Sequence, residues 1–208
     1  MSMYDYETRA LGQGKKNIAG TDEAGRGPLA GPVVAAAVIL DPNKRIEGLN
    51  DSKKLSKSVR DKLFKEIKKK ALAYSVCFID NKEIDEINIL EASRKAMTIA
   101  IKSLEIKPDF IITDYMKLKE IDIPFIDLAH GDALSASVAA ASIVAKVTRD
   151  KYMEELDTKY PGYSFKKNKG YPTKEHIEAI RRLGVTDIHR KTYSPVSEII
   201  NSQISFDI

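Results

Sequence analysis

Four acidic residues stand at the ends of apolar segments, where side chains from distant parts of a chain can meet. Asp22 and Glu23 close the segment NIAGTDE, Asp114 ends DFIITD, and Asp132 precedes an alanine-rich stretch. Ends of neighbouring strands converge on one edge of a sheet, so we expect these carboxylates to share a site. Clustered carboxylates repel one another unless cations neutralise them, and Mg²⁺ prefers oxygen ligands. The pattern therefore predicts a two-metal site suited to phosphodiester hydrolysis.

Each acid also has a simpler explanation when it is considered alone. Asp132 can cap the helix predicted after it, and Asp114 can be a turn residue. Asp22 and Glu23 can be solvated acids at a strand end. The spacing of the four acids is thus consistent with a metal site, and these alternatives stay open.

Glycines at positions 25, 27 and 31 follow the acidic pair in the segment GTDEAGRGPLAG. A dinucleotide-binding fingerprint is excluded because a strand rather than a helix is predicted next, and no Walker-type motif occurs. The loop can be a simple hairpin connection with Arg26 in solvent. Alternatively, the absence of side chains lets backbone approach a sugar. A ribose 2′-hydroxyl suits such contacts because it both donates and accepts hydrogen bonds.

Apolar segments of strand length alternate with segments of helical periodicity. Strands are predicted over residues 17–22, 32–40, 71–79, 109–114 and 123–129. Helices are predicted over the basic segment after Ser56 and over residues 82–105, 133–160 and 173–183, with another after Pro195. This alternation indicates an α/β fold that ends in a helical tail.

The composition is that of a folded globular chain, with 208 residues of which 43% are hydrophobic and 31% are charged. The net charge of +4 is too small to identify a partner. The single cysteine, Cys77, lies in an apolar run, where a buried inert thiol is expected. No signal peptide is visible and no apolar run reaches about 20 residues, so we expect a cytoplasmic protein that does not enter the membrane.

Five motifs appear in a fixed order along the chain: GTDEAGRGPLAGPVVAAAVIL, DSKKLS, GDALSASVAAASIVAKVTRD, NKGYPTKEH and HRKTYSPV. In this order and spacing the chain resembles the bacterial ribonuclease HII family from about Asn17 to Val196. The resemblance implies an RNase H-like mixed five-stranded sheet flanked by helices. It also implies a catalytic domain over residues 1–160 and a helical C-terminal extension over 161–208 that contributes to substrate binding.

The same resemblance implies a monomer that cleaves the RNA strand of RNA/DNA hybrids. It further implies incision 5′ of single ribonucleotides in duplex DNA, which leaves 3′-hydroxyl and 5′-phosphate ends. The family's catalytic and metal-binding acids fall on Asp22, Glu23, Asp114 and Asp132. Two Mg²⁺ or Mn²⁺ ions are then expected in the substrate complex.

The family's substrate-binding residues fall on Gly25, Arg26, Gly27, Tyr171, Lys53, Lys54, His189 and Arg190. By this resemblance the glycine loop senses the 2′-hydroxyl and Tyr171 stacks on the deoxyribose that follows. The basic residues are expected to touch backbone phosphates. Considered alone, Tyr171 is a turn residue before a proline, and each basic residue is a solvated surface charge.

The chain departs from the family pattern at two places. TDYMK stands around Asp114 where many relatives have glycine and asparagine after the acid, and Asn168 stands where histidine is frequent. Near the C-terminus, QISF at residues 203–206 loosely resembles a sliding-clamp motif, so a weak clamp contact near Gln203 is a further expectation.

Two other classes of function stay open. A non-catalytic nucleic-acid-binding module would use the basic helix and the glycine loop without needing the acids. A different RNase H-like metal nuclease would share the acids but would cut substrates with and without ribose equally. Chelators and ribose-free substrates separate these alternatives from a ribonuclease H.

Overall fold

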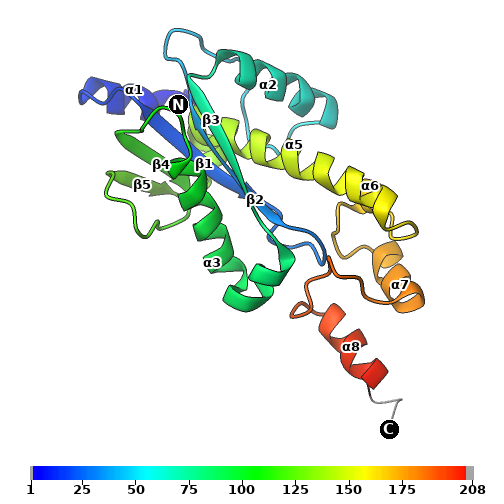
Figure 1. Cartoon of the computed structure of the whole chain (residues 1–208). Coiled ribbons are helices and arrows are strands. Elements are labelled where there is room, and N and C mark those ends of the chain that lie inside the picture. The colour runs from blue at the N-terminus through cyan, green and yellow to red at the C-terminus, as the bar shows by residue number, and fades with distance from the viewer. Residues whose placement is uncertain (1, 205–208) are drawn as a thin grey trace.

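The computed structural model describes residues 2–204, and a five-stranded sheet forms its centre (Figure 1). The strands are β1 (Ile18–Ala24), β2 (Val33–Ile39), β3 (Ala73–Ile79), β4 (Phe110–Asp114) and β5 (Phe125–Leu128). Their order across the sheet is β3-β2-β1-β4-β5. β2 runs antiparallel to β1 and β3, whereas β4 runs parallel to β1 and β5. The predicted α/β fold with a mixed sheet is therefore confirmed, and all five strands form where the sequence predicted them.

Eight helices accompany the sheet in the described part of the chain. They are α1 (Asp5–Gly12), α2 (Lys57–Lys70), α3 (Asn81–Lys102), α4 (Gly131–Leu134), α5 (Ala136–Lys159), α6 (Phe165–Asn168), α7 (Lys174–Leu183) and α8 (Val196–Ile204). The predicted helices α2, α3, α7 and α8 are confirmed, and Ser56 caps α2 as expected. Helices α1 and α6 were not predicted from the sequence. None of the described helices is long and apolar enough to cross a membrane.

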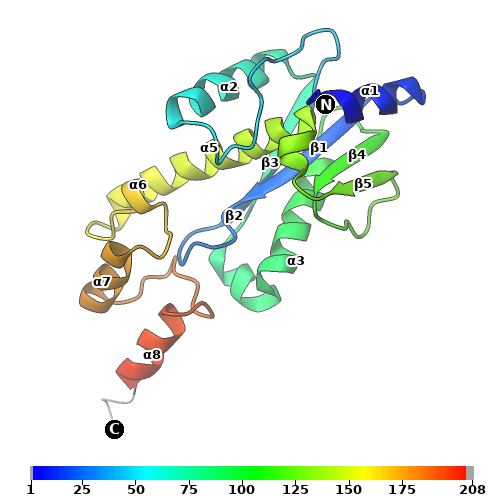
Figure 2. The same ribbon diagram turned by 180° about the vertical axis from the view of Figure 1, so that it is seen from behind.

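Two helical layers enclose the sheet (Figures 1 and 2). Strand β2 is buried along its whole length, as its continuous apolar sequence predicts. Because side chains alternate along a strand, Ala35 and Ala37 pack in the cluster with α3, whereas Ala36 and Val38 pack in the cluster with α2 and α5. The sheet is thus an inner layer, and functional groups can reach solvent at the ends of its strands.

A glycine allows α5 to lie directly against the central strand. A Cβ atom added to Gly20 would lie 2.1 Å from the backbone carbon of Ser137. No side chain fits at this distance, so Gly20 sets how closely the first turn of α5 approaches β1. This approach brings the α4–α5 junction next to the acidic end of β1.

The single helix predicted over residues 133–160 is wrong at its beginning. Ser135 adopts an extended backbone conformation, which separates α4 from α5, and its hydroxyl accepts a hydrogen bond from the amide of Val138. A serine hydroxyl competes with helical hydrogen bonding in this way. Glu7 of α1 supports the break, because its Oε1 accepts the amide of Ser137 at 2.9 Å and both serine hydroxyls.

The C-terminal segment packs mainly on the far end of α5, and Tyr193 also contacts the cluster between α3 and the sheet. Phe165, Ile180 and Val196 form an apolar cluster with Met153 of α5 and with Leu29 from the β1–β2 connection. The tail therefore shares a core with the glycine loop. The proposed division of the chain at residue 160 remains a prediction.

Candidate active site

Three of the four predicted acids meet at one edge of the sheet. One carboxylate oxygen from each of Asp22, Asp114 and Asp132 lies within 4.8 Å of the other two. The parallel register of β1 and β4 sets Asp22 beside Asp114. Asp114 Oδ1 accepts the amide of Gly131 at 2.7 Å, which ties the short helix α4, and with it Asp132, to the end of β4. Asp132 therefore does not cap the long helix, whose N-cap is Ser135.

Glu23 lies beside this triad but is not part of it. It follows Asp22 near the end of β1, and its charge helps to raise the pKa of Asp22. Its Oε1 is 3.5 Å from Arg26 Nη1, while its Oε2 is buried without a hydrogen-bond partner among the described residues. Burial raises the pKa of Glu23, Arg26 counters the rise, and the charge of Asp114 adds to it. An orphaned buried oxygen next to other acids suits a cation ligand, and this role of Glu23 remains a prediction.

The triad is electrostatically unfavourable without a cation. Burial, followed by the charges of Glu23 and Asp114, raises the pKa of Asp22 well above its ordinary value. Burial, followed by the charges of Asp114 and Asp51, raises the pKa of Asp132 to about 6. Buried carboxylates that repel one another fit hard divalent cations with oxygen ligands, and the cluster offers no histidine or thiolate.

The DSKKLS segment supplies two further groups at the triad. Asp51, which the sequence did not single out, adds its negative charge beside Asp132. Burial lowers the pKa of Lys53, but Asp22 and Asp132 more than offset this and leave it raised, so the ammonium group lies within their field. Lys54 is exposed. Lys53 is thus placed to meet a phosphate held at the triad, and phosphate contact by either lysine remains a prediction.

The glycine loop and Tyr171 lie side by side. A Cβ atom added to Gly27 would lie 3.9 Å from Cε1 of Tyr171, and the amide of Leu29 donates to the carbonyl of Gly170 at 2.8 Å. Tyr171 is 39% exposed, and Lys146 Nζ lies 5.6 Å from the centre of its ring. The structure therefore presents on one surface two residues that the resemblance assigned to neighbouring sugars, Gly27 to the ribose and Tyr171 to the deoxyribose that follows.

His189 and Arg190 are not surface groups, which corrects the expectation that they touch phosphates. Both side chains are fully buried. Arg190 donates to the carbonyls of Gly25, Arg26 and Gly31, and His189 contacts His176. Their polar atoms are occupied by protein partners, so neither can reach a phosphate directly. Sequence reasoning missed this because isolated basic residues are usually exposed.

The two positions that depart from the family pattern, the residue after Asp114 and Asn168, lie at the ends of β4 and α6. Tyr115, after Asp114, has φ of 48°, a left-handed conformation that glycine adopts without strain, and its ring is exposed. Asn168 is buried, where it donates to the carbonyl of Tyr163 and accepts the amide of Gly170. Asn168 therefore shapes the turn that carries Tyr171.

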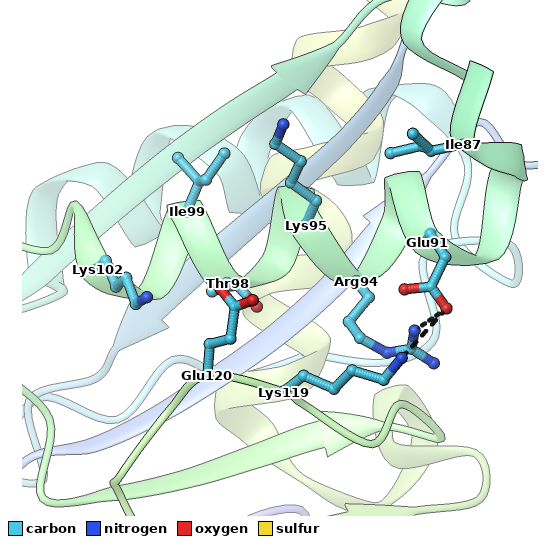
Figure 3. A pocket seen from close by; sticks show the side chains of 9 residues that line it. All are labelled: Ile87, Glu91, Arg94, Lys95, Thr98, Ile99, Lys102, Lys119 and Glu120. Atoms are coloured by element: carbon cyan, nitrogen blue, oxygen red, sulfur yellow. Dashed lines mark hydrogen bonds and ion pairs between the residues drawn. The ribbon is translucent and has the colours of Figure 1, made fainter. Parts of the chain in front are cut away.

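A cavity of about 570 Å³ lies elsewhere, between α3 and the β4–β5 connection (Figure 3). Arg94 and Lys119 at its rim both pair with Glu91, as the dashed lines show. None of the predicted site residues lines it. The chemistry of the chain is therefore concentrated at the acidic edge of the sheet and not in this cavity.

We expect divalent cations to stabilise the folded protein through the triad. Because the pKa of Asp132 is raised to about 6 from 3.8, the folded state binds the proton more tightly than the unfolded state. Without metal, the contribution of this group to stability is present at low pH and is lost as the pH rises through about 6. At pH 7.5, Mn²⁺ or Mg²⁺ should raise the Tm measured by differential scanning fluorimetry.

The Asp132→Asn variant is the matched control for this prediction. Its Tm without metal should fall less between pH 5 and pH 7.5 than that of the unmodified protein, and Mn²⁺ should raise it less. Equal responses of the two proteins to Mn²⁺ would remove Asp132 from the metal site.

Comparisons with known proteins agree with this geometry. The family model for ribonuclease HII matches residues 19–196. A ribonuclease HII from Ruminiclostridium cellulolyticum is 54% identical over 191 residues, which cover 92% of this chain and 75% of the relative. The crystal structure of ribonuclease H2 from Pyrococcus horikoshii superposes with a TM-score of 0.77 at 32% identity, covering 90% of this chain and 98% of that one. The RNase HII of a PCNA complex from Archaeoglobus fulgidus gives a TM-score of 0.73 at 27% identity, covering 86% and 96%.

Proposed function

Because this chain belongs to the ribonuclease HII family, whose members are endonucleases that cut RNA in RNA/DNA hybrids, we propose that it also incises 5′ of single ribonucleotides in duplex DNA. The observation that carries the proposal is the close approach of Tyr171 to Gly27, in a loop that directly follows the acids of β1 and whose Arg26 pairs with Glu23. A backbone loop that accepts a 2′-hydroxyl and a ring that meets the next sugar together recognise one ribose followed by one deoxyribose.

In this proposal the triad, together with Glu23, holds two divalent cations, Mg²⁺ or Mn²⁺. Three clustered carboxylates and a buried orphan oxygen form an all-oxygen donor set suited to these ions. When bound, such ions lower the pKa of an attacking water and neutralise charge on the departing 3′ oxygen. No covalent bond between enzyme and substrate is required.

The chain's own groups then orient the substrate. The carbonyls and amides of residues 25–27 approach the ribose edge because no side chain except that of Arg26 intervenes. Lys53, within the field of the acids, binds a phosphate next to the scissile bond. The exposed ring of Tyr171 packs against the deoxyribose on the 3′ side. Hydrolysis at this position leaves a 3′-hydroxyl and a 5′-phosphate.

The decisive experiment uses a labelled DNA duplex with one internal ribonucleotide and the same duplex without ribose. With Mg²⁺ or Mn²⁺ we expect one cut 5′ of the ribonucleotide, no cut in the ribose-free duplex, and no reaction in EDTA. Equal cutting of both duplexes would favour a different metal nuclease. Binding without any cleavage would favour a non-catalytic module.

Contact with a sliding clamp stays a separate prediction. The segment concerned, residues 203–206, has its side chains outside the described residues. The Archaeoglobus fulgidus relative was solved in a complex with PCNA, which supports testing the contact here. The proposed cleavage does not depend on it.

A further inference from the structure

Four buried side chains connect the C-terminal segment to the glycine loop. They are Arg149, Arg190, His176 and His189, and we call them the tail lock. Each is fully buried, and all are polar groups that the proposed chemistry does not use. Burying an arginine side chain is costly unless its N–H donors are hydrogen-bonded. The partners of these four side chains therefore indicate what they do.

Arg190 holds the first part of the loop. Its guanidinium donates to the carbonyl of Gly25 at 2.6 Å, of Arg26 at 2.8 Å and of Gly31 at 3.0 Å. The planar group has five N–H donors in a fixed arrangement, so these contacts fix the loop carbonyls relative to one another. Lysine keeps the charge but cannot reproduce this fork.

Arg149 of α5 holds the second part of the loop and the segment before Tyr171. It donates to the carbonyls of Pro32 at 2.9 Å, Ala30 at 3.1 Å and Lys169 at 2.9 Å. A Cβ atom at Gly25 would lie 2.2 Å from its Nε, so the glycine leaves the space that the guanidinium occupies. The loop and the tyrosine segment are thus bonded to the same side chain.

The two histidines form a hydrogen-bond chain with one possible direction. The amide of Thr186 can only donate, so Nδ1 of His189, 3.0 Å away, is an acceptor and its proton is on Nε2. That Nε2 donates across 3.2 Å to Nε2 of His176, whose Nδ1 must then donate to the carbonyl of Tyr171 at 2.9 Å. Both rings are therefore neutral, and the chain ends on the backbone of the substrate-reading tyrosine.

We propose that the tail lock positions the glycine loop and Tyr171 as one rigid unit that reads the ribose–deoxyribose junction. The inference rests on the proposed function and names the residues that set its specificity. They act through the loop and the tyrosine and do not touch the substrate. In a continuous hybrid the sugar next to Tyr171 is a ribose, so the junction contact is absent there and the lock matters less.

The test compares Arg190→Lys with Ile180→Val, a buried substitution in the same apolar cluster that touches none of the hydrogen bonds. For each protein, kcat/KM is measured on a duplex with one ribonucleotide and on an RNA/DNA hybrid of the same sequence. We expect Arg190→Lys to lower incision at the single ribonucleotide about tenfold more than hybrid cleavage, a change of about 1.4 kcal/mol in discrimination. Ile180→Val should leave the ratio unchanged. An equal loss on both substrates would show that the lock only supports the fold.

A second measurement keeps the inference testable if Arg190→Lys does not fold. Long-range ¹H–¹⁵N spectra of the unmodified protein should show the Nε2–H tautomer for His189 and the Nδ1–H tautomer for His176. Hydrogen exchange at the amides of residues 25–27 should accelerate in His176→Asn and not in Ile180→Val. Other tautomers, or unchanged exchange, would overturn the lock. Failure of the unmodified protein to cut at a single ribonucleotide would instead overturn the proposed function and leave these two readouts intact.

Discussion

Replacement of Asp22 by asparagine should reduce hybrid cleavage about a thousandfold while the protein stays folded. Asparagine keeps the shape and one oxygen of the side chain but removes a charge from the triad, and metal-dependent stabilisation of this kind is worth several kcal/mol. Burial raises the pKa of Asp22, so its charge opposes folding when no metal is bound. The Tm without metal should therefore be unchanged or higher, and single-turnover cleavage with Mn²⁺ gives the rate.

Asp127→Asn is the matched control, because Asp127 is exposed on β5 and lies outside the triad. It should keep the rate of the unmodified protein within about twofold, since surface substitutions away from a site have small effects. If Asp22→Asn still cleaved within tenfold of the unmodified protein, the triad would not be the catalytic centre.

Gly20→Ala should destabilise the protein by about 3 kcal/mol or more, although it adds a single methyl group. The new Cβ would lie 2.1 Å from the carbon and 2.3 Å from the nitrogen of backbone atoms at the start of α5. Backbone cannot rotate away as a side chain can, so α5 must shift from β1. For a chain of this size we expect Tm to fall by roughly 6 to 12 °C in thermal unfolding followed by circular dichroism.

The same substitution at Gly12 provides the control. Gly12 ends α1, and an added Cβ would meet nothing within 4 Å. Alanine favours helix over glycine, so Gly12→Ala should leave Tm unchanged or raise it slightly. A fall in Tm for Gly20→Ala no larger than that for Gly12→Ala would show that α5 does not press on β1 as described.

The strands were predictable because each is a short apolar run bounded by turn residues, and β2 is apolar on both faces. Helix α1 was not, because only Glu7 and Ala10 are buried in it and so no apolar stripe marks it. The break at Ser135 was missed because its cause is a carboxylate brought from α1 by folding. Local sequence does not contain such a contact.

At the site, the position of an acid at the end of an apolar segment was enough to find the triad. Asp51 escaped notice because it lies in a polar segment with no such landmark. His189 and Arg190 were misassigned because their partners are backbone carbonyls, which every sequence has. The motif that contains them was recognised, but only the fold shows that both side chains are buried beneath the glycine loop.

The placement of Arg190 beneath the glycine loop has a consequence during synthesis on the ribosome. The glycine loop is synthesised before its guanidinium partner, because Arg190 lies 165 residues after Gly25 in the chain. A nascent chain can assemble the acidic triad once α4 and α5 have emerged, whereas the glycine loop gains its hydrogen bonds to Arg190 only after the following segment has been made. Chains cut short by a nonsense codon between α5 and Arg190 would therefore keep the metal ligands and lose the side chain that fixes the glycine loop.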